Sequence, residues 1–470
     1  MSAGAGAARA SRAARRSTTT SNFGVSKRES HDASGFYARF EPPQLDDDDT
    51  VHPPRPVDEP IVCGDARDMH TVADDSVALV VTSPPYFAGK QYEEELERDG
   101  VPSSYLEYLD LLHDVFAECV RVLEPGGRIA VNVANLGRKP YRSLAADVIH
   151  ILQDRLGLLL RGEIVWQKGA GASGSCAWGS FRSPSNPVLR DVTERVIVAS
   201  KGRFQRALTT EQRRARGLPA ESTISTEDFM ALTLDVWQTP SESARRVGHP
   251  APFPVELPEK LIELYTFEGD LVLDPFMGSG STLVAASRLG RRYVGYDLDA
   301  GYVDLARMRV DEEGEPYEPD SNRLAGSKDT IAEALAVAGF PDGEGPGARL
   351  KGSGLVVHDV VTDATGGRWV IELGGAFVRY RGGLTSADAV WRTLGRAHAL
   401  RGLDERVLVL TSTLPKHRSE LDLALRAAGS EAFFDIIDVF DREALERLAA
   451  YASGTTRQLP GFWYPEDLDG

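Results

Sequence analysis

Short apolar runs alternate with longer amphipathic stretches over much of the chain, and this alternation limits the fold more than any other feature. Residues 77–82 form a continuous apolar run of the kind that is buried on both faces of a parallel sheet. Residues 104–123 place apolar side chains at helical spacing, and a Pro-Gly-Gly triplet at 125–127 is expected to stop the helix. The pattern therefore predicts an α/β fold in which a parallel sheet carries helices on both faces.

The same reasoning predicts further elements in two successive parts of the chain. In the first part, strands are expected over residues 60–65, 77–82, 128–133, 163–166, 195–199, 271–273 and 293–296, and helices over 104–123, 144–156, 258–265 and 281–289. In the second part, strands are expected over 355–360, 369–373 and 407–410, and helices over 386–400 and 418–428.

Length and composition divide the chain further. At 470 residues it is long enough for two or three domains. Residues 1–56 lack periodicity and end in Pro- and Asp-rich sequence, so we expect a mostly disordered arm. Residues 57–312 then form the first domain, the acidic segment 313–327 a linker, and residues 328–470 a smaller C-terminal α/β domain.

Cysteine usage and hydropathy exclude several classes of protein. The 3 cysteines lack metal-ligand spacing, which favours a reducing cytoplasm without a disulfide or zinc framework. No apolar run approaches the ~18 residues that a membrane-spanning helix needs, so we expect no membrane segment.

The segment Thr82-Ser83-Pro84-Pro85-Tyr86 closes the first buried strand and suits an exocyclic amino group. The nitrogen of such a group shares its lone pair with the ring and is a poor nucleophile. The Ser83 hydroxyl and the Pro84 carbonyl could accept its two protons, and adjacent prolines stiffen the segment that carries them. Tyr86 could stack on the face of an extruded base. Four such residues are usually only a turn, but their place at the end of a buried strand favours a base pocket.

A glycine-rich segment, Asp274-Pro275-Phe276-Met277-Gly278-Ser279-Gly280-Ser281-Thr282, follows a later strand. Its glycines allow close backbone approach to a ligand, and Ser281 and Thr282 are expected to cap the next helix. Asp297 ends the following strand about twenty residues on, as a carboxylate that binds a ribose diol would. No Lys follows the last glycine, which disfavours phosphate binding of the Walker type, and the dinucleotide spacing G-x-G-x-x-G is absent.

The order of these two motifs, amino-group pocket first and glycine segment second, resembles the β class of DNA amino-methyltransferases. The resemblance covers roughly residues 60–310 and implies a Rossmann-like sheet that uses S-adenosyl-L-methionine. The usual family segment ends in Thr-Thr rather than Ser-Thr. The residues implied for cofactor binding are Asp65, Phe253, Asp274, Phe276, Gly278, Gly280, Thr282 and Asp297, and those implied for catalysis are Ser83, Pro84, Pro85 and Tyr86.

Serine at the first position of the pocket resembles the cytosine-N4 members, whereas Asp is more usual in adenine-N6 enzymes. Cytosine N4 in double-stranded DNA is therefore the expected target, with adenine N6 as the alternative. A catalytically silent DNA-binding component is the alternative from another class. Methylation of a protein glutamine is disfavoured because those enzymes carry the cofactor segment first. A cognate restriction nuclease is a conceivable partner, and monomer and dimer stay open.

The formal charge of -17 argues against a nucleic-acid partner, but phosphate contacts depend on local charge. One basic stretch surrounds a short interval, residues 202–234, where the family's target-recognition region lies. The arginines expected to contact DNA are Arg182, Arg190, Arg203, Arg206, Arg213 and Arg214.

The C-terminal part weakly resembles the metal-binding strands of restriction-type nucleases through Asp359 or Asp363 and Glu372. Such a site wants a Lys two residues after the Glu, and Gly374 stands there. We therefore expect an accessory domain with no metal site and no metal-dependent cleavage, while a methylase–nuclease fusion is the alternative.

Overall fold

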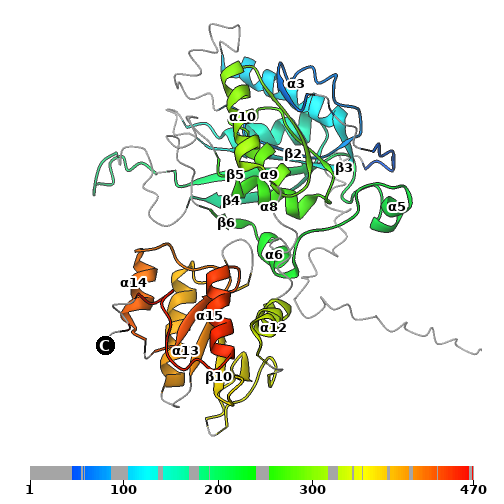
Figure 1. Ribbon diagram of the computed structural model, residues 1–470. Helices are drawn as coiled ribbons and strands as arrows, with labels where there is room; N and C mark the ends of the chain where they lie inside the picture. The colour runs from blue at the N-terminus through cyan, green and yellow to red at the C-terminus, as the bar shows by residue number, and fades with distance from the viewer. Residues whose placement is uncertain are drawn as a thin grey trace, which may run out of the picture. The chain divides into compact units, whose positions relative to one another are not determined.

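The structure is a computed structural model, shown in Figure 1. It describes residues 45–53, 57, 59–85, 104–135, 141–168, 179–189, 191–239, 253–315, 327–340, 343–351, 353–377, 382–401, 406–430, 432–464 and 468. Tyr86, Arg190 and nearly all of the predicted N-terminal arm lie outside these residues.

An eight-stranded sheet organises the first domain. Its order is β1 (Ile61–Cys63), β8 (Arg292–Asp297), β7 (Leu271–Asp274), β2 (Val77–Thr82), β3 (Leu123–Val133), β5 (Thr193–Ser200), β4 (Leu159–Gln167) and β6 (Val236–Gln238). The strands from β1 to β3 in this order are parallel, as predicted.

The strand β5 departs from the prediction, because it runs antiparallel to both β3 and β4. Its run of buried residues looks like that of a parallel strand, and burial on both faces carries no information about strand direction. A wholly parallel sheet was therefore the wrong expectation, although all the expected strands of this domain form.

Helices cover both faces of the sheet. The helix α3 (Tyr105–Val122) packs on one face together with α4 (Leu144–Ile149) and the π-helical turn η2 (His150–Arg155). On the other face lie α8 (Glu256–Tyr265), α9 (Ser281–Arg288) and α10 (Ala300–Glu313). The last of these, α10, contacts the first strand, where the Arg307 Nη2 donates a hydrogen bond of 3.1 Å to the Ile61 carbonyl.

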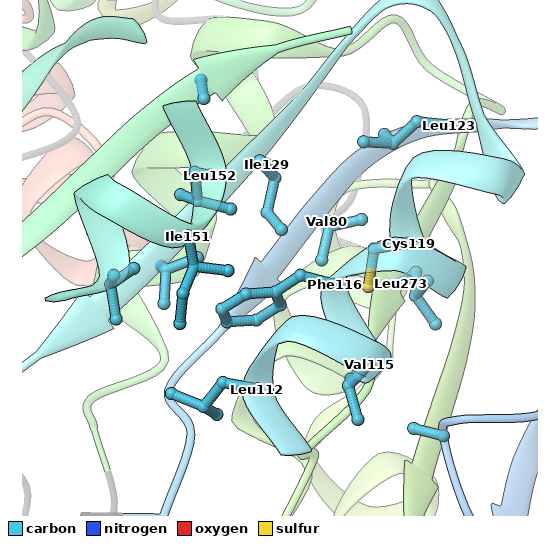
Figure 2. Packing of buried hydrophobic residues seen from close by; sticks show 14 of the residues in the cluster. Val80, Leu112, Val115, Phe116, Cys119, Leu123, Ile129, Ile151, Leu152 and Leu273 are labelled. Atoms are coloured by element: carbon cyan, nitrogen blue, oxygen red, sulfur yellow. The ribbon is translucent and has the colours of Figure 1, made fainter. Parts of the chain in front are cut away.

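The core beneath α3 fixes that helix against the sheet. Figure 2 shows Phe116 between Leu112 and Ile151, with Val80 of β2 close by, and all four side chains are at most 1% exposed. Burying each such side chain stabilises the fold by roughly 1.5–3 kcal/mol. The apolar face of α3 differs at its start from the expected one, since Leu106 is 72% exposed whereas Tyr108 is buried.

Two short helices, α5 (Thr210–Ala215) and α6 (Thr226–Leu232), occupy the expected target-recognition interval. A capping box starts α5, because the Thr209 side chain accepts from the Gln212 backbone and the Gln212 side chain accepts from the Thr209 backbone.

The second domain has its own four-stranded sheet, ordered β12 (Asp435–Asp438), β11 (Val407–Thr411), β10 (Arg368–Leu373) and β9 (Asp359–Thr362). Only β9 is antiparallel to its neighbour. Its helices are α12 (Ser327–Ala338), α13 (Ala387–Arg401), α14 (Glu420–Ala427) and α15 (Arg442–Ala452).

This second sheet has a separate core on each of its two faces. The strand expected at 355–360 begins only at Asp359, since the residues before it form an isolated bridge and a loop. Among the described helices, none combines the length and the apolar composition that would let it cross a membrane.

Candidate active site

The two sequence motifs meet at the centre of the first sheet. Strands β2 and β7 are parallel neighbours, so their carboxyl ends, at Ser83 and Asp274, emerge at the same edge. Strands β8 and β1 bring Asp297 and Asp65 to that edge as well. From β7 the chain proceeds to β8 on one side, and from β2 to β3 on the other. Ligands of open α/β sheets bind at such a reversal of strand order.

A buried carboxylate joins the two motifs directly. Asp274 is 0% exposed, and its Oδ1 accepts a hydrogen bond of 2.6 Å from Thr82 Oγ1 and one of 3.1 Å from the Phe276 backbone. Burial raises the pKa of Asp274 to about 6, against the hydrogen bond from Thr82. The carboxylate has no exposed surface, and the expected cofactor contact of Asp274 stays a prediction. Its place in the structure is between the two loops.

The glycine loop, residues 274–280, has the backbone that its sequence predicts. Gly278 and Gly280 have φ values of 47° and 77°, in the region that favours glycine. A Cβ on Gly280 would lie 2.9 Å from the Ala306 Cβ, so the loop and α10 can approach only because this side chain is missing. The loop therefore presents backbone rather than side chains to its surroundings.

The helix α9 starts without the expected caps. Gly280 is its N-cap and makes no side-chain hydrogen bond. Ser281 Oγ accepts from Arg309 instead, and Thr282 Oγ1 donates 3.3 Å to the Val81 carbonyl of β2. Thr282 is 0% exposed and connects the glycine loop's helix to β2. Its expected cofactor contact stays a prediction.

Asp297 supports the glycine loop from the next strand. Its Oδ2 accepts 3.0 Å from the Gly278 backbone, and its Oδ1 accepts 2.9 Å from the Asp299 backbone. Burial raises the pKa of Asp297. Each carboxylate oxygen has a second lone pair, so the group retains capacity for further donors.

Asp65 lies at the end of β1 and forms an ion pair with Arg67 at 2.5 Å. The hydrogen bonds from Arg67 hold the pKa of Asp65 below its usual range. The two expected aromatic contacts, Phe253 and Phe276, are both half-buried, and each packs against the core on a different face of the sheet.

The proline loop, residues 83–85, is fixed on several sides. Thr82 donates to Asp274, as described above, and Ser83 Oγ donates 3.2 Å to the Asn132 carbonyl of β3. The Tyr108 hydroxyl of α3 donates 2.6 Å to the Pro85 carbonyl. Within the described residues, the Pro84 carbonyl accepts no hydrogen bond. Neither Tyr108 nor Asn132 was predicted from the sequence to contribute to the site.

The described arginines that were expected to contact DNA do not form a single surface. Arg206 and Arg213 are buried with Glu124 and Asp270, and Arg213 Nη2 lies 2.8 Å from an oxygen of Asp270. Both guanidinium groups also lie over the Phe267 ring, 5.5 and 5.1 Å from its centroid. The expected DNA contact is wrong for Arg206 and Arg213, since their charges are neutralised inside the fold.

The direction of strand β5 explains why the arginines that follow it lie away from the proline loop. Because β5 is antiparallel, its last residue, Ser200, pairs with Arg128 near the start of β3, away from the edge that carries the proline loop. The chain after β5 therefore continues at the opposite edge. Arg203 donates to the Asp47 and Asp48 carbonyls there, and Arg214 pairs with Glu221 at 2.9 Å.

Arg182 is placed differently. It lies in the segment between β4 and β5, whose adjoining ends, Gln167 and Thr193, pair at the edge of the proline loop. A bridge between Gly179 and Pro187 closes this segment, and Arg182 is exposed with a φ of 55°. Of the described arginines that were expected to contact DNA, it is the one on the site's side of the sheet.

The carboxylates of the C-terminal domain do not converge. Asp359 is paired with Ile371 in the ladder, so Glu372 points to the opposite face of the sheet. Arg396 Nε donates 3.0 Å to Glu372. Desolvation opposes ionisation of Asp363, but hydrogen bonds from Thr365 and Trp369 lower its pKa to about 2. No three His, Cys, Asp or Glu side chains in the described part of the chain are arranged to hold a metal ion.

Residues 77–308 match the N6/N4 family model, which is described as DNA methylase. This range contains the proline loop, the glycine loop and Asp297, but not Asp65.

Similar proteins include the Type II methyltransferase M.MthZI of Methanothermobacter thermautotrophicus, which is 32% identical over 53% of this chain and 75% of its own length. The Type II methyltransferase M.MjaI of Methanocaldococcus jannaschii is 29% identical over 53% of this chain and 90% of its own length. Among solved structures, TTHA0409 of Thermus thermophilus, complexed with S-adenosyl-L-methionine, is 32% identical, with a TM-score of 0.40 over 54% of this chain and 93% of that one.

Proposed function

The chain belongs to the N6/N4 DNA methylase family, and from this premise we propose that it methylates the exocyclic N4 of cytosine in duplex DNA. The observation that carries the proposal is the junction of the two loops, where Thr82 of the proline loop's strand donates to Asp274 of the glycine loop. Ser rather than Asp at position 83 favours cytosine over adenine.

The glycine loop fits the family's cofactor. S-adenosyl-L-methionine supplies an electrophilic methyl group on a positive sulfur. Gly278 and Gly280 adopt the positive φ values that shape the loop backbone for a ligand, and the spare lone pairs of Asp297 suit the two ribose hydroxyls. Asp65 is the proposed acceptor for the adenine amino group, with Arg67 keeping it ionised.

The proline loop fits a target amino group. Ser83 Oγ donates to the Asn132 carbonyl, and a hydroxyl oxygen has two acceptor lone pairs, so this atom is proposed to accept one N–H of the amine. The Pro84 carbonyl, which accepts nothing from the described residues, can take the other N–H. Tyr86, the next residue, is proposed to stack on the extruded base.

Transfer needs only alignment of the amine with the methyl group. The nitrogen forms the new N–C bond as the C–S bond breaks, and the amine then loses one proton. The acceptors on the proline loop favour a nitrogen whose lone pair points at the methyl carbon, and a fixed loop provides them without reorganisation. Direct displacement requires no covalent intermediate on a cysteine.

DNA reaches this edge of the sheet with Arg182 as a proposed phosphate contact. Arg190 follows in the sequence and is proposed for the same role. Because Arg203 and Arg214 lie in the segment at the opposite edge, we no longer assign them to the DNA interface. The Type II designation of the relatives supports a role in restriction–modification, with a separate nuclease as the partner.

The decisive experiment is methylation of an unmethylated plasmid with labelled cofactor, followed by mass spectrometry of the nucleosides. We expect N4-methylcytosine. N6-methyladenine would retain the cofactor and amine sites but reject the assignment from Ser83. Cofactor binding without any label in DNA would point to a silent DNA-binding component.

A further inference from the structure

The diproline of the proline loop limits how that loop can be held. Pro84 and Pro85 have no backbone N–H, so neither can be tied down as a hydrogen-bond donor. Their carbonyl oxygens are the remaining polar groups. Tyr108 donates to the carbonyl of Pro85, whereas that of Pro84 receives no hydrogen bond from the described residues.

The Tyr108 hydroxyl is held rigidly by α3. Tyr108 is 2% exposed, and the Leu112 and Phe116 side chains that follow it on the helix are 0% exposed in the core. The O–H···O distance of 2.6 Å is at the short end of the usual range. The hydroxyl is thus a fixed donor, brought to the loop from 23 residues along the chain.

Fixing the Pro85 carbonyl also restricts the Pro84 carbonyl. The Pro84 carbonyl lies in the peptide plane between the two prolines, and the torsions between that plane and the Pro85 carbonyl are φ and ψ of Pro85. The proline ring locks φ near about −65°. One soft torsion is left, so a hydrogen bond at Pro85 narrows the directions in which the Pro84 oxygen can point.

We propose that Tyr108 is a positioning residue for methyl transfer, which holds Pro85 so that the Pro84 carbonyl points at the target amine. The proposal rests on the proposed function, because it assigns the amine to the Pro84 carbonyl. Thr82 and Ser83 anchor the other end of the loop to β7 and β3. Loss of the Tyr108 hydroxyl therefore releases only the end of the loop that contains Pro84 and Pro85.

The same helix offers a matched control. Tyr105 precedes Tyr108 by three residues, their ring centroids are 5.9 Å apart, and its hydroxyl also donates over 2.6 Å. Its acceptor is Asp147 of α4 rather than the proline loop. Tyr105→Phe and Tyr108→Phe thus remove the same group from the same helix, and only the second releases the loop.

The test compares both variants of the full chain with the wild type. We expect Tyr108→Phe to slow single-turnover methylation of duplex DNA by about tenfold, since a small misplacement of a reacting geometry is costly. The dissociation constant for S-adenosyl-L-methionine should not change, and Tyr105→Phe should retain the wild-type rate. Equal slowing in both variants, or no slowing in Tyr108→Phe, would overturn the proposal.

The ¹³C chemical shift of the Pro84 carbonyl provides a readout that does not depend on turnover. It should change in Tyr108→Phe and keep the wild-type value in Tyr105→Phe. If the wild type methylates no DNA, the proposed function fails, while an unchanged shift in Tyr108→Phe would separately reject the role of Tyr108 in fixing the loop.

Discussion

At the scale of single residues, Asp274 connects the strand that carries the proline loop with the glycine loop. Its carboxylate accepts from Thr82 on one side and from the backbone of Phe276 on the other, with no exposure to solvent. A carboxylate in this place costs stability when it is ionised, because burial raises its pKa to about 6.

The raised pKa predicts how stability depends on pH. Because the pKa of Asp274 is higher in the folded state, its protonated form stabilises the fold. This contribution to the free energy of unfolding is complete below the unfolded pKa of 3.8 and is lost as the pH rises through about 6. Asp274→Asn, which keeps an oxygen for Thr82, removes this dependence. The free energy of unfolding of the variant relative to the wild type should rise by about 1 kcal/mol from about pH 5 to about pH 8. Denaturant titrations of the ligand-free protein measure it, and a constant difference would contradict the assignment.

Substitutions at Ser83 and Asp297 should separate binding of the amine from binding of the cofactor. Ser83→Ala removes an acceptor for the amine, so we expect turnover to fall about 100-fold with cofactor affinity unchanged. Asp297→Ala removes the proposed ribose acceptor and a support of Gly278, so we expect cofactor affinity to fall. Calorimetric titration and single-turnover kinetics distinguish the two effects, and the assigned roles are wrong if the two variants behave alike.

At the scale of elements, the sequence predicts the strands and helices around the site well, because apolar periodicity and glycine turns are local signals. The edge of the sheet at which a segment lies is not determined by local sequence. The arginines after β5 look like a DNA-binding stretch in sequence, but the antiparallel direction of β5 sends them to the far edge. Tyr108 was missed because a tyrosine on an apolar helix face looks like any core residue until its hydroxyl is seen to reach Pro85.

The buried arginine cluster predicts a contrast between adjacent residues. Arg213→Ala leaves Glu124 and Asp270 buried with one cation fewer, so the free energy of unfolding should fall by about 3–5 kcal/mol. Arg214→Ala breaks an exposed pair with Glu221 and should cost less than about 1 kcal/mol. Urea unfolding of both variants tests this, and similar losses would show that the cluster does not stabilise the fold as described.

At the scale of the whole molecule, the described part of the chain contains two sheets with separate cores. Every residue assigned to the cofactor or the amine belongs to the first domain. In the second, Asp359, Asp363 and Glu372 are each engaged in local contacts. The second domain is therefore proposed as an accessory domain.

This division predicts the thermal behaviour of the chain. Calorimetry should show two unfolding transitions. S-adenosyl-L-methionine should raise the midpoint temperature of only one of them, that of the first domain. At a cofactor concentration about 100 times the dissociation constant, the stabilisation should be about 2.7 kcal/mol. A single transition, or an equal shift of both, would mean that the domains unfold together.

The contact between the first strand and the last helix of the methyltransferase domain has a consequence for its architecture. Arg307 of α10 donates to Ile61 of β1, so the domain's entry and exit points are neighbours. When the two ends of a domain are adjacent, they can be linked, and new termini can be placed in another loop. The site is assembled from strand ends and does not depend on the order in which the chain visits them. A circularly permuted chain that begins before α8 would carry the glycine loop ahead of the proline loop and still bring Thr82 to Asp274.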